Sequence, residues 1–291
     1  MKTKLILTVV AAMAIALSAC ATIKQEKGKK DIGLQLYSLR ADIKKDYAGT
    51  IKAAADMGYT AVEAAGYKDG KFYGKTPEEF KKDVEAAGMK LTGSHAGRML
   101  SKKEVQTGDF SESMKWWKDT IAAHKAAGIK YLVMPYARFS SEAELKAYAK
   151  YFNQIGKLCK DAGLRFGYHN HSHEFNKVGK YVVMDYLIQN TDPDLVSYEM
   201  DVYWVGRGGR SPVEMFKQYP NRFMLLHIKD LKELGQSGMV GFDAIFNNLP
   251  KSVEGIFVEV ERYNYEPKVS TKMSYDYLKN SCFVPYSYPK K

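Results

Sequence analysis

The sequence predicts an α/β protein folded as a single (β/α)8 barrel, and three observations support this class. Four times along the chain, a helical stretch ends in a glycine that is followed by an apolar residue and a short run of β-forming residues. Taken together, eight strand-like runs alternate with helix-like stretches. Regular alternation of this kind produces parallel strands joined by right-handed crossovers. Eight such units in about 260 residues match the size of a closed barrel better than that of an open sheet.

The four glycines are Gly58, Gly88, Gly128 and Gly163, in the segments DMGYTAVEAA, AAGMKLTGSH, AAGIKYLVMP and DAGLRFGYHN. A helix commonly ends with a residue in the left-handed conformation, which glycine adopts without steric cost. The apolar residue that follows then packs back on the last helical turn. Each segment therefore predicts the end of a helix, a tight turn and a strand.

The predicted strands lie near residues 32–37, 60–65, 90–95, 130–135, 165–171, 195–201, 222–228 and 255–260. The stretches between them carry apolar residues at the spacing of one helix face. One of these stretches begins with Thr76, Pro77 and Glu79, the pattern of a capping box. No G-x-G-x-x-G motif follows the first strand, which disfavours a dinucleotide-binding fold.

The chain begins with a segment typical of an export signal. Lys2 and Lys4 precede an apolar run that ends just before Cys20. The run is shorter than the roughly 20 residues that cross a bilayer, and small residues directly before a cysteine are typical of a bacterial lipoprotein signal. An ordinary signal peptide with an incidental cysteine and a cytoplasmic protein are the alternatives. We expect a signal peptide at 1–19, lipidation of Cys20, a flexible tether at 20–30 and the barrel domain at 31–291.

This interpretation predicts a periplasmic protein that is anchored to a bacterial membrane by lipid. The formal net charge is +11, from 44 Lys and Arg against 33 Asp and Glu. Many of the excess lysines lie in the tether and at the last two positions of the chain, and basic residues beside a lipid anchor suit an anionic membrane surface. The basic residues form no stripe interleaved with aromatic residues, so the sequence disfavours a nucleic-acid partner.

Polar residues gather at the predicted carboxyl ends of the strands, where barrel enzymes hold their active sites. Five of the six histidines lie there, and only His124 lies within a helix. The set comprises Glu63, His95, Tyr168, His169, Asn170, His171, His173, Glu174, Glu199, Asp201, His227, Lys229, Asp230, Glu259 and Glu261.

Three of these residues suggest a metal site. If Asp201, His227 and Glu259 all point into the barrel, three adjacent strands converge on one point. Carboxylate and imidazole ligands from separate strands suit one divalent ion such as Mn²⁺, Co²⁺, Mg²⁺ or Zn²⁺. A hydrogen-bonded polar cluster without a metal is the alternative.

From about Asp31 to Leu278 the chain resembles the sugar phosphate isomerase/epimerase family, whose members have a xylose isomerase-like TIM barrel. The segments YHNHSHEF, EMDVYWVGRGG, FMLLHIKD and FVEVE carry the resemblance. It implies one metal ion, held by an acidic residue on the fifth strand, an aspartate on the sixth, a histidine on the seventh and a glutamate on the eighth. By motif, the last three ligands are Asp201, His227 and Glu259.

Two positions depart from the family pattern. The fifth strand has His169, Asn170 and His171 where many relatives have Glu-Asn or Glu-x-His. The remaining metal ligand is therefore either His169, which alignment favours, or Glu174, which charge balance favours. In addition, Trp204 stands where epimerases and the related endonucleases often have a histidine, which weakens both activities as predictions for this chain.

The resemblance implies a divalent-metal-dependent enzyme that removes a proton next to a carbonyl and so forms an enediolate. Because phosphorylated sugars are cytosolic, we expect an unphosphorylated sugar or keto-sugar as the substrate and a sugar isomerase or epimerase as the activity. A hydratase or lyase acting on 3-keto-sugars or 3-keto-glycosides is the first alternative. A non-catalytic sugar-binding lipoprotein is the second alternative.

The candidate residues divide into two roles beyond metal binding. We expect His171, Lys229 and Glu259 to act in catalysis, since an imidazole, an ammonium and a carboxylate can each carry a proton. We expect Glu63, His95 and Trp204 to bind the substrate.

Overall fold

The computed structural model of the protein describes residues 28–289. The predicted signal peptide, the lipidation site Cys20 and the first part of the tether lie outside the described residues. Lys30, the last residue of the predicted tether, is buried, and its Nζ donates to the carbonyl oxygens of Leu278 and Ser281 at 3.3 and 2.5 Å. The chain is therefore attached to the barrel domain from Lys30 onward. Between residues 28 and 289, no helix has the length and apolar character needed to cross a membrane.

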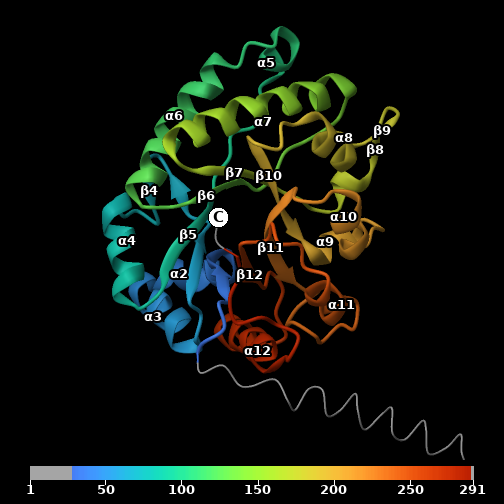
Figure 1. The fold of residues 1–291 in the computed structure, drawn as a ribbon. Helices are drawn as coiled ribbons and strands as arrows, with labels where there is room; N and C mark the ends of the chain where they lie inside the picture. The colour runs from blue at the N-terminus through green and yellow to red at the C-terminus, as the bar shows by residue number, and fades with distance from the viewer. Residues whose placement is uncertain (1–27, 290–291) are drawn as a thin grey trace, which may run out of the picture.

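Eight parallel strands close into a barrel in the order β1-β12-β11-β10-β7-β6-β5-β2 (Figure 1). They are β1 (Gly33–Gln35), β2 (Ala61–Ala64), β5 (Lys90–His95), β6 (Tyr131–Met134), β7 (Arg165–His169), β10 (Val196–Asp201), β11 (Phe223–Lys229) and β12 (Gly255–Glu259). The barrel closes where Gly33 of β1 pairs with Phe257 of β12. The predicted (β/α)8 barrel is confirmed.

Helices alternate with the strands and surround the barrel (Figure 1). They are α2 (Arg40–Lys45), α3 (Tyr47–Met57), α4 (Pro77–Ala86), α5 (Lys102–Thr107), α6 (Ser111–Ala126), α7 (Glu142–Ala162), α8 (Val183–Asn190), α9 (Val202–Arg207), α10 (Pro212–Gln218), α11 (Phe242–Asn247) and α12 (Pro267–Asn280). The loops after strands carry the 3-10 helices η1 (Leu36–Leu39) and η2 (His173–Phe175) and two hairpins, β3 (Tyr67–Lys68) with β4 (Lys71–Phe72) and β8 (Lys177–Val178) with β9 (Tyr181–Val182).

The local signals in the sequence appear at helix ends. Gly58 and Gly163 directly follow α3 and α7 with φ angles of 111° and 84°, the left-handed conformation that stops a helix. At the start of α4, Thr76 Oγ1 accepts a hydrogen bond from Glu79 N at 3.2 Å, and Glu79 Oε2 accepts one from Thr76 N at 2.8 Å. These reciprocal bonds satisfy two of the amide groups that a helix leaves unpaired at its start.

The barrel interior changes character along its axis. Toward the amino ends of the strands, Tyr131, Leu225 and Phe257 belong to a buried apolar cluster. Along β11, Leu225 shares its face with His227 and Lys229, because side chains of a strand alternate between its two faces. The interior is therefore apolar at one end and polar at the other.

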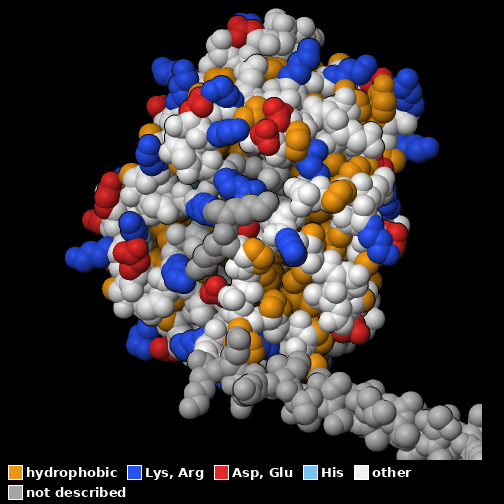
Figure 2. Space-filling view, in the orientation of Figure 1, with side chains coloured by type: hydrophobic (Ala, Val, Ile, Leu, Met, Phe, Trp, Pro, Cys, Tyr) orange, Lys and Arg blue, Asp and Glu red, His pale blue; other side chains and the backbone are white. Residues whose placement is uncertain are grey.

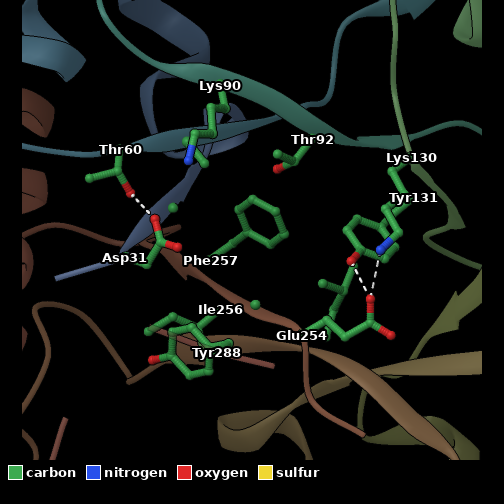
Figure 3. Close-up of a pocket in the computed structure, with 14 residues that line it drawn as sticks. Asp31, Thr60, Lys90, Thr92, Lys130, Tyr131, Glu254, Ile256, Phe257 and Tyr288 are labelled. Carbon is green, nitrogen blue, oxygen red and sulfur yellow. Dashed lines mark hydrogen bonds and ion pairs between the residues drawn. The ribbon is translucent and has the colours of Figure 1, made fainter. Parts of the chain in front are cut away.

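The C-terminal segment lies at the amino end of the barrel, where Asp31 N donates to Tyr286 O at 2.9 Å. A cavity of about 230 Å³ lies at this end, and Figure 3 shows Tyr131 and Lys130 directed toward Glu254 at one side of it. In the view of Figure 2, Lys and Arg side chains are spread over the surface and interspersed with Asp and Glu. The polar end of the interior lies opposite this cavity.

Candidate active site and metal centre

Seven strands contribute side chains to one cluster at the carboxyl end of the barrel. The cluster consists of Gln35, Glu63, His95, His169, Glu199, Asp201, His227, Lys229 and Glu259. All of these side chains except that of His95 are buried. The predicted metal- and substrate-binding residues Glu63, His95, His169, Asp201, His227 and Glu259 therefore lie in this cluster, whereas Glu174 and Trp204 lie outside it.

Asp201, His227 and Glu259 come from the adjacent strands β10, β11 and β12, and one ligand atom from each lies within 4.8 Å of the others. We call these three residues the metal trio. Asp201 Oδ2 and His227 Nδ1 are buried and have no hydrogen-bond partner among the described residues. An unsatisfied buried polar atom costs about 1–3 kcal/mol, and a cation between these atoms would remove that cost. Two carboxylates and an imidazole therefore fit the divalent ion that the sequence predicts.

His227 is held from its other side by two glutamates. His227 Nε2 lies 2.7 Å from Glu63 Oε2 and 3.1 Å from Glu199 Oε2. Gln35 Nε2 donates to the same Glu63 oxygen at 2.8 Å. A carboxylate bound to the far nitrogen of a metal-ligating histidine fixes the ring and its tautomer. Glu63, predicted to bind substrate, is completely buried behind His227.

His95 and His169 also converge on Glu199. His95 Nε2 and His169 Nδ1 lie 2.7 and 3.0 Å from Glu199 Oε2. Together with His227, these residues form a second group whose ligand atoms lie within 4.8 Å of one another. The His169 ring centre lies 4.6 Å from that of His227, and its Nε2 is the nitrogen left for a ligand role. His169 is thus next to the metal trio while its Nδ1 contacts Glu199.

Glu174, the other candidate for the fifth-strand ligand, lies apart from the metal trio. Its Oε1 accepts a hydrogen bond from the Tyr168 hydroxyl at 2.7 Å, and its Oε2 accepts one from His171 N at 2.8 Å. Its Oε1 also lies 3.4 Å from His173 Nε2. These contacts hold the loop that follows β7, so the geometry favours His169 over Glu174 as the side chain beside the metal trio.

The remaining catalytic and substrate-binding candidates surround the metal trio. Lys229 Nζ lies 3.5 Å from Glu259 Oε2 and 6.0 Å from the centre of the Trp204 ring. The His171 ring centre lies 5.8 Å from that of Trp204, and His171 Nδ1 is buried without a partner among the described residues. Trp204 N donates to Asp201 Oδ1 at 2.8 Å, which links the start of α9 to the trio.

Burial and neighbouring charges determine the charge states in this cluster. Burial is the main cause that raises the pKa of Asp201 to about 8, and it lowers the pKa of His171 to about 4. Burial opposes ionisation of Glu259, but Lys229 and His227 outweigh it, so the pKa of Glu259 is lowered. Burial likewise opposes the charge of Lys229, but Glu259, Asp201 and Glu261 raise its pKa. The site thus combines a neutral imidazole, an ammonium and a carboxylate.

A family model described as a xylose isomerase-like TIM barrel matches residues 51–281. This chain belongs to the xylose isomerase-like TIM barrel family. The match covers all the cluster residues except Gln35.

Relatives of this xylose isomerase-like chain carry two kinds of name. A solved sugar phosphate isomerase/epimerase from Parabacteroides distasonis ATCC 8503 is 35% identical, with a TM-score of 0.82, over 88% of this chain and 100% of that chain. An inosose dehydratase of Geobacillus kaustophilus is 21% identical over 61% of this chain and 60% of the relative. An inosose dehydratase of Clostridium tetani is 32% identical over 32% of this chain and 30% of the relative. The chain therefore spans about 30 to 60% of the length of these two curated relatives.

Two cluster residues of this xylose isomerase-like barrel have no predicted role. Gln35 is absent from the predicted set, and Glu199 is present only as a strand-end residue. Strand alternation would have indicated Glu199, because it shares a face of β10 with Asp201. Gln35 ends β1 directly beside Glu63 of β2, so the barrel register would have indicated it as well.

Proposed function

We propose that this protein is a divalent-metal-dependent carbon–oxygen lyase or hydratase that acts on a keto-sugar. The observation that carries the proposal is the kind of side chain next to the metal trio. His169, His171 and Lys229 lie there, whereas Glu174 is engaged in the loop after β7. An epimerase needs a second proton carrier opposite Glu259, and the family pattern places an acidic residue on the fifth strand for this. The dehydratase names of two relatives support the same choice.

The side chains suggest a role for each step. A divalent ion at the metal trio would polarise the substrate carbonyl and stabilise the negative charge that develops on its oxygen. His171, whose Nδ1 has no hydrogen-bond partner within residues 28–289, accepts the proton from the carbon next to the carbonyl. Lys229, held by Glu259 at 3.5 Å and Glu261 at 2.7 Å, donates a proton to the leaving oxygen.

Each bond that breaks in this reaction is matched by a bond that forms. The carbon–hydrogen bond next to the carbonyl breaks, and its electron pair forms a double bond to the neighbouring carbon. The carbon–oxygen bond at that neighbouring carbon breaks, and the oxygen leaves with the proton from Lys229. The products are an unsaturated keto-sugar and either water, when a hydroxyl leaves, or an alcohol, when a glycosidic oxygen leaves. Hydration is the same reaction in reverse.

The proposed location rests on the sequence. We propose a periplasmic protein that is lipid-anchored through Cys20, because the first twenty residues have the pattern of a lipoprotein signal. Since phosphorylated sugars are cytosolic, the proposed substrate is unphosphorylated.

Incubation of the metal-loaded protein with 3-keto-sugars and 3-keto-glycosides in D₂O tests this function. We expect deuterium at the carbon next to the carbonyl together with an unsaturated keto product, both detected by NMR. Lys229→Met should abolish product formation, whereas Lys251→Met, which removes an exposed lysine, should not. Deuterium exchange with an isomerised or epimerised sugar as the only product would overturn the lyase proposal in favour of an isomerase. Neither exchange nor product across the panel would favour a sugar-binding protein.

A further inference from the structure

Exposed apolar side chains gather at one end of this barrel. Among the described residues, the large hydrophobic side chains with the greatest exposure are Tyr37, Met99, Tyr136, Met239, Tyr265 and Val269, each 41 to 57% exposed. Every one lies between the carboxyl end of a barrel strand and the first turn of a following helix. In a (β/α)8 barrel these connections surround the active site. The exposed apolar surface is therefore collected at the mouth above the metal trio.

A continuous line of contacts joins the metal trio to the exposed Tyr136. Lys229 Nζ lies 3.5 Å from Glu259 Oε2 and 6.0 Å from the centre of the Trp204 ring. The Trp204 ring centre is 5.8 Å from that of His171, which in turn is 5.9 Å from that of Tyr136. These side chains form one wall that leads outward from the site.

A second line of contacts leads to the exposed Tyr37. Lys229 Nζ lies 2.7 Å from Glu261 Oε2, and the Glu261 carbonyl oxygen accepts a hydrogen bond from Arg40 Nη2 at 2.9 Å. The Arg40 guanidinium lies 4.5 Å from the centre of the Tyr37 ring and donates to the Tyr263 hydroxyl at 2.7 Å. Arg40 therefore holds two aromatic rings in place and forms a second wall.

The two walls share Lys229 and lead from it to opposite sides of the barrel mouth. Tyr37 and Tyr263 follow β1 and β12, whereas Tyr136 follows β6, and β6 lies opposite β12 in the strand order. In the first wall, Trp204 Nε1 is buried without a hydrogen-bond partner among the described residues. A buried indole N–H normally has a partner, so an oxygen of a bound molecule fits this position.

We propose that these walls form an outer subsite that binds a planar, apolar group attached to the sugar. The substrate class is then a glycoside with an aromatic aglycone, with its sugar ring at the metal trio and its aglycone in the mouth that the two walls border. This inference rests on the proposed function and deepens it, because the oxygen that leaves in the lyase reaction would carry the aglycone. Aromatic rings bind a planar group by stacking and by burial of apolar surface.

Binding calorimetry with phenyl β-D-glucoside and methyl β-D-glucoside tests the subsite on the full chain loaded with Mn²⁺. Neither probe has a ketone, so the measurement does not depend on turnover. We expect the phenyl glucoside to bind roughly tenfold more tightly, the gain for about 60 Å² of additional buried apolar surface. Tyr136→Ala and Tyr37→Ala should each reduce this preference, and Tyr136→Phe should retain it. Tyr286→Ala, which removes an aromatic ring at the amino end of the barrel, is the matched control.

Several outcomes would overturn the subsite. Equal affinities for the two glucosides would do so, and so would no measurable binding of the phenyl glucoside at millimolar concentration. Concentration-dependent dimerisation in ultracentrifugation that Tyr136→Ala abolishes would assign the same surface to a second copy of the chain. Kinetics with the 3-keto derivatives separate the two proposals: equal kcat/KM values overturn the subsite alone, whereas tight phenyl glucoside binding without turnover supports the subsite and overturns the lyase.

Discussion

His227 has different surroundings at its two ring nitrogens. Nδ1 faces Glu259, whose Oε2 lies 3.6 Å away, and has no hydrogen-bond partner among the described residues. Nε2 contacts Glu63 and Glu199 at 2.7 and 3.1 Å. If Nε2 carries the proton, Nδ1 presents a lone pair toward the metal trio. The glutamates behind the ring therefore determine which nitrogen is available to a metal ion.

Glu63→Gln tests this arrangement through metal affinity. The amide keeps the shape of the side chain but lacks the negative charge that orients His227 and increases its basicity. We expect Mn²⁺ affinity to fall by about 10- to 100-fold, the usual effect of losing such a carboxylate, as measured by calorimetry and by chelator competition. Glu78→Gln, on the exposed surface of α4, should bind Mn²⁺ like the wild type. An unchanged affinity in Glu63→Gln would show that the glutamate does not act through His227.

His124, in α6, makes stability depend on pH without belonging to the site. Its Nδ1 lies 2.7 Å from the Thr120 carbonyl oxygen and its Nε2 lies 3.0 Å from Ser94 Oγ. Burial lowers the pKa of His124 from its ordinary value of 6.5 to about 4. Between these two values the unfolded chain binds a proton that the folded chain does not. The contribution of His124 to stability is therefore complete above pH 6.5 and is lost progressively as the pH falls toward 4.

Urea unfolding at pH 7 and pH 4 measures this contribution. Between the two pH values, the wild type should lose about 3 kcal/mol more unfolding free energy than His124→Gln, since one pKa unit corresponds to about 1.4 kcal/mol. Other titrating groups affect both proteins equally, so the difference between them isolates His124. Parallel pH profiles for wild type and variant would contradict the prediction.

At the scale of elements, α7 packs closely against the segment before β10 at Gly156. A Cβ atom on Gly156 would lie 2.3 Å from the carbonyl oxygen of Leu195, just before β10. Gly156→Ala should therefore destabilise the protein by about 1–3 kcal/mol, because overpacking outweighs the better helix propensity of alanine. Gly206→Ala in α9 should instead be neutral or stabilising, because the added Cβ atom would have no described atom within 4 Å apart from its own helix backbone and chain neighbours. Thermal unfolding of both variants checks the prediction, and equal melting temperatures would contradict it.

Local sequence patterns predict the regular elements but not how each strand ends. The strand expected at 165–171 ends at His169, because the side chain of the next residue, Asn170, hydrogen-bonds to the backbone of β10. There, Asn170 Oδ1 accepts a hydrogen bond from Asp201 N at 3.2 Å. The hairpin of β3 and β4 has a sequence signal in its Asp69-Gly70 turn, but the loop around it is also fixed by a hydrogen bond of 2.9 Å from Ala65 N to the Tyr73 hydroxyl. Such contacts depend on the assembled barrel.

At the scale of the whole molecule, one part of the site follows from local sequence patterns, and the other part depends on contacts across the assembled barrel. Strand alternation on three consecutive barrel strands is sufficient to bring Asp201, His227 and Glu259 together. The position of Glu63 behind His227 depends on contacts between β2 and β11, residues 164 apart in the sequence, across the closed barrel. The choice between His169 and Glu174 likewise depends on where the loop after β7 turns. Periodicity and spacing carry no information about either arrangement.

The assembled metal trio also predicts that metal binding stabilises the entire barrel. The three ligands come from β10, β11 and β12 and meet only in the folded chain, so an ion that binds them favours the folded state. At a free Mn²⁺ concentration of 100 times Kd, the gain is about 2.7 kcal/mol, which corresponds to roughly 5–10 °C in Tm for a domain of this size. Calorimetric scans with Mn²⁺ and with a chelator should differ by this amount for the wild type and for Asp243→Asn, a change on the exposed surface of α11. Asp201→Asn should lose most of the difference. Coincident scans of the wild type, or a full shift in Asp201→Asn, would contradict metal binding by the trio.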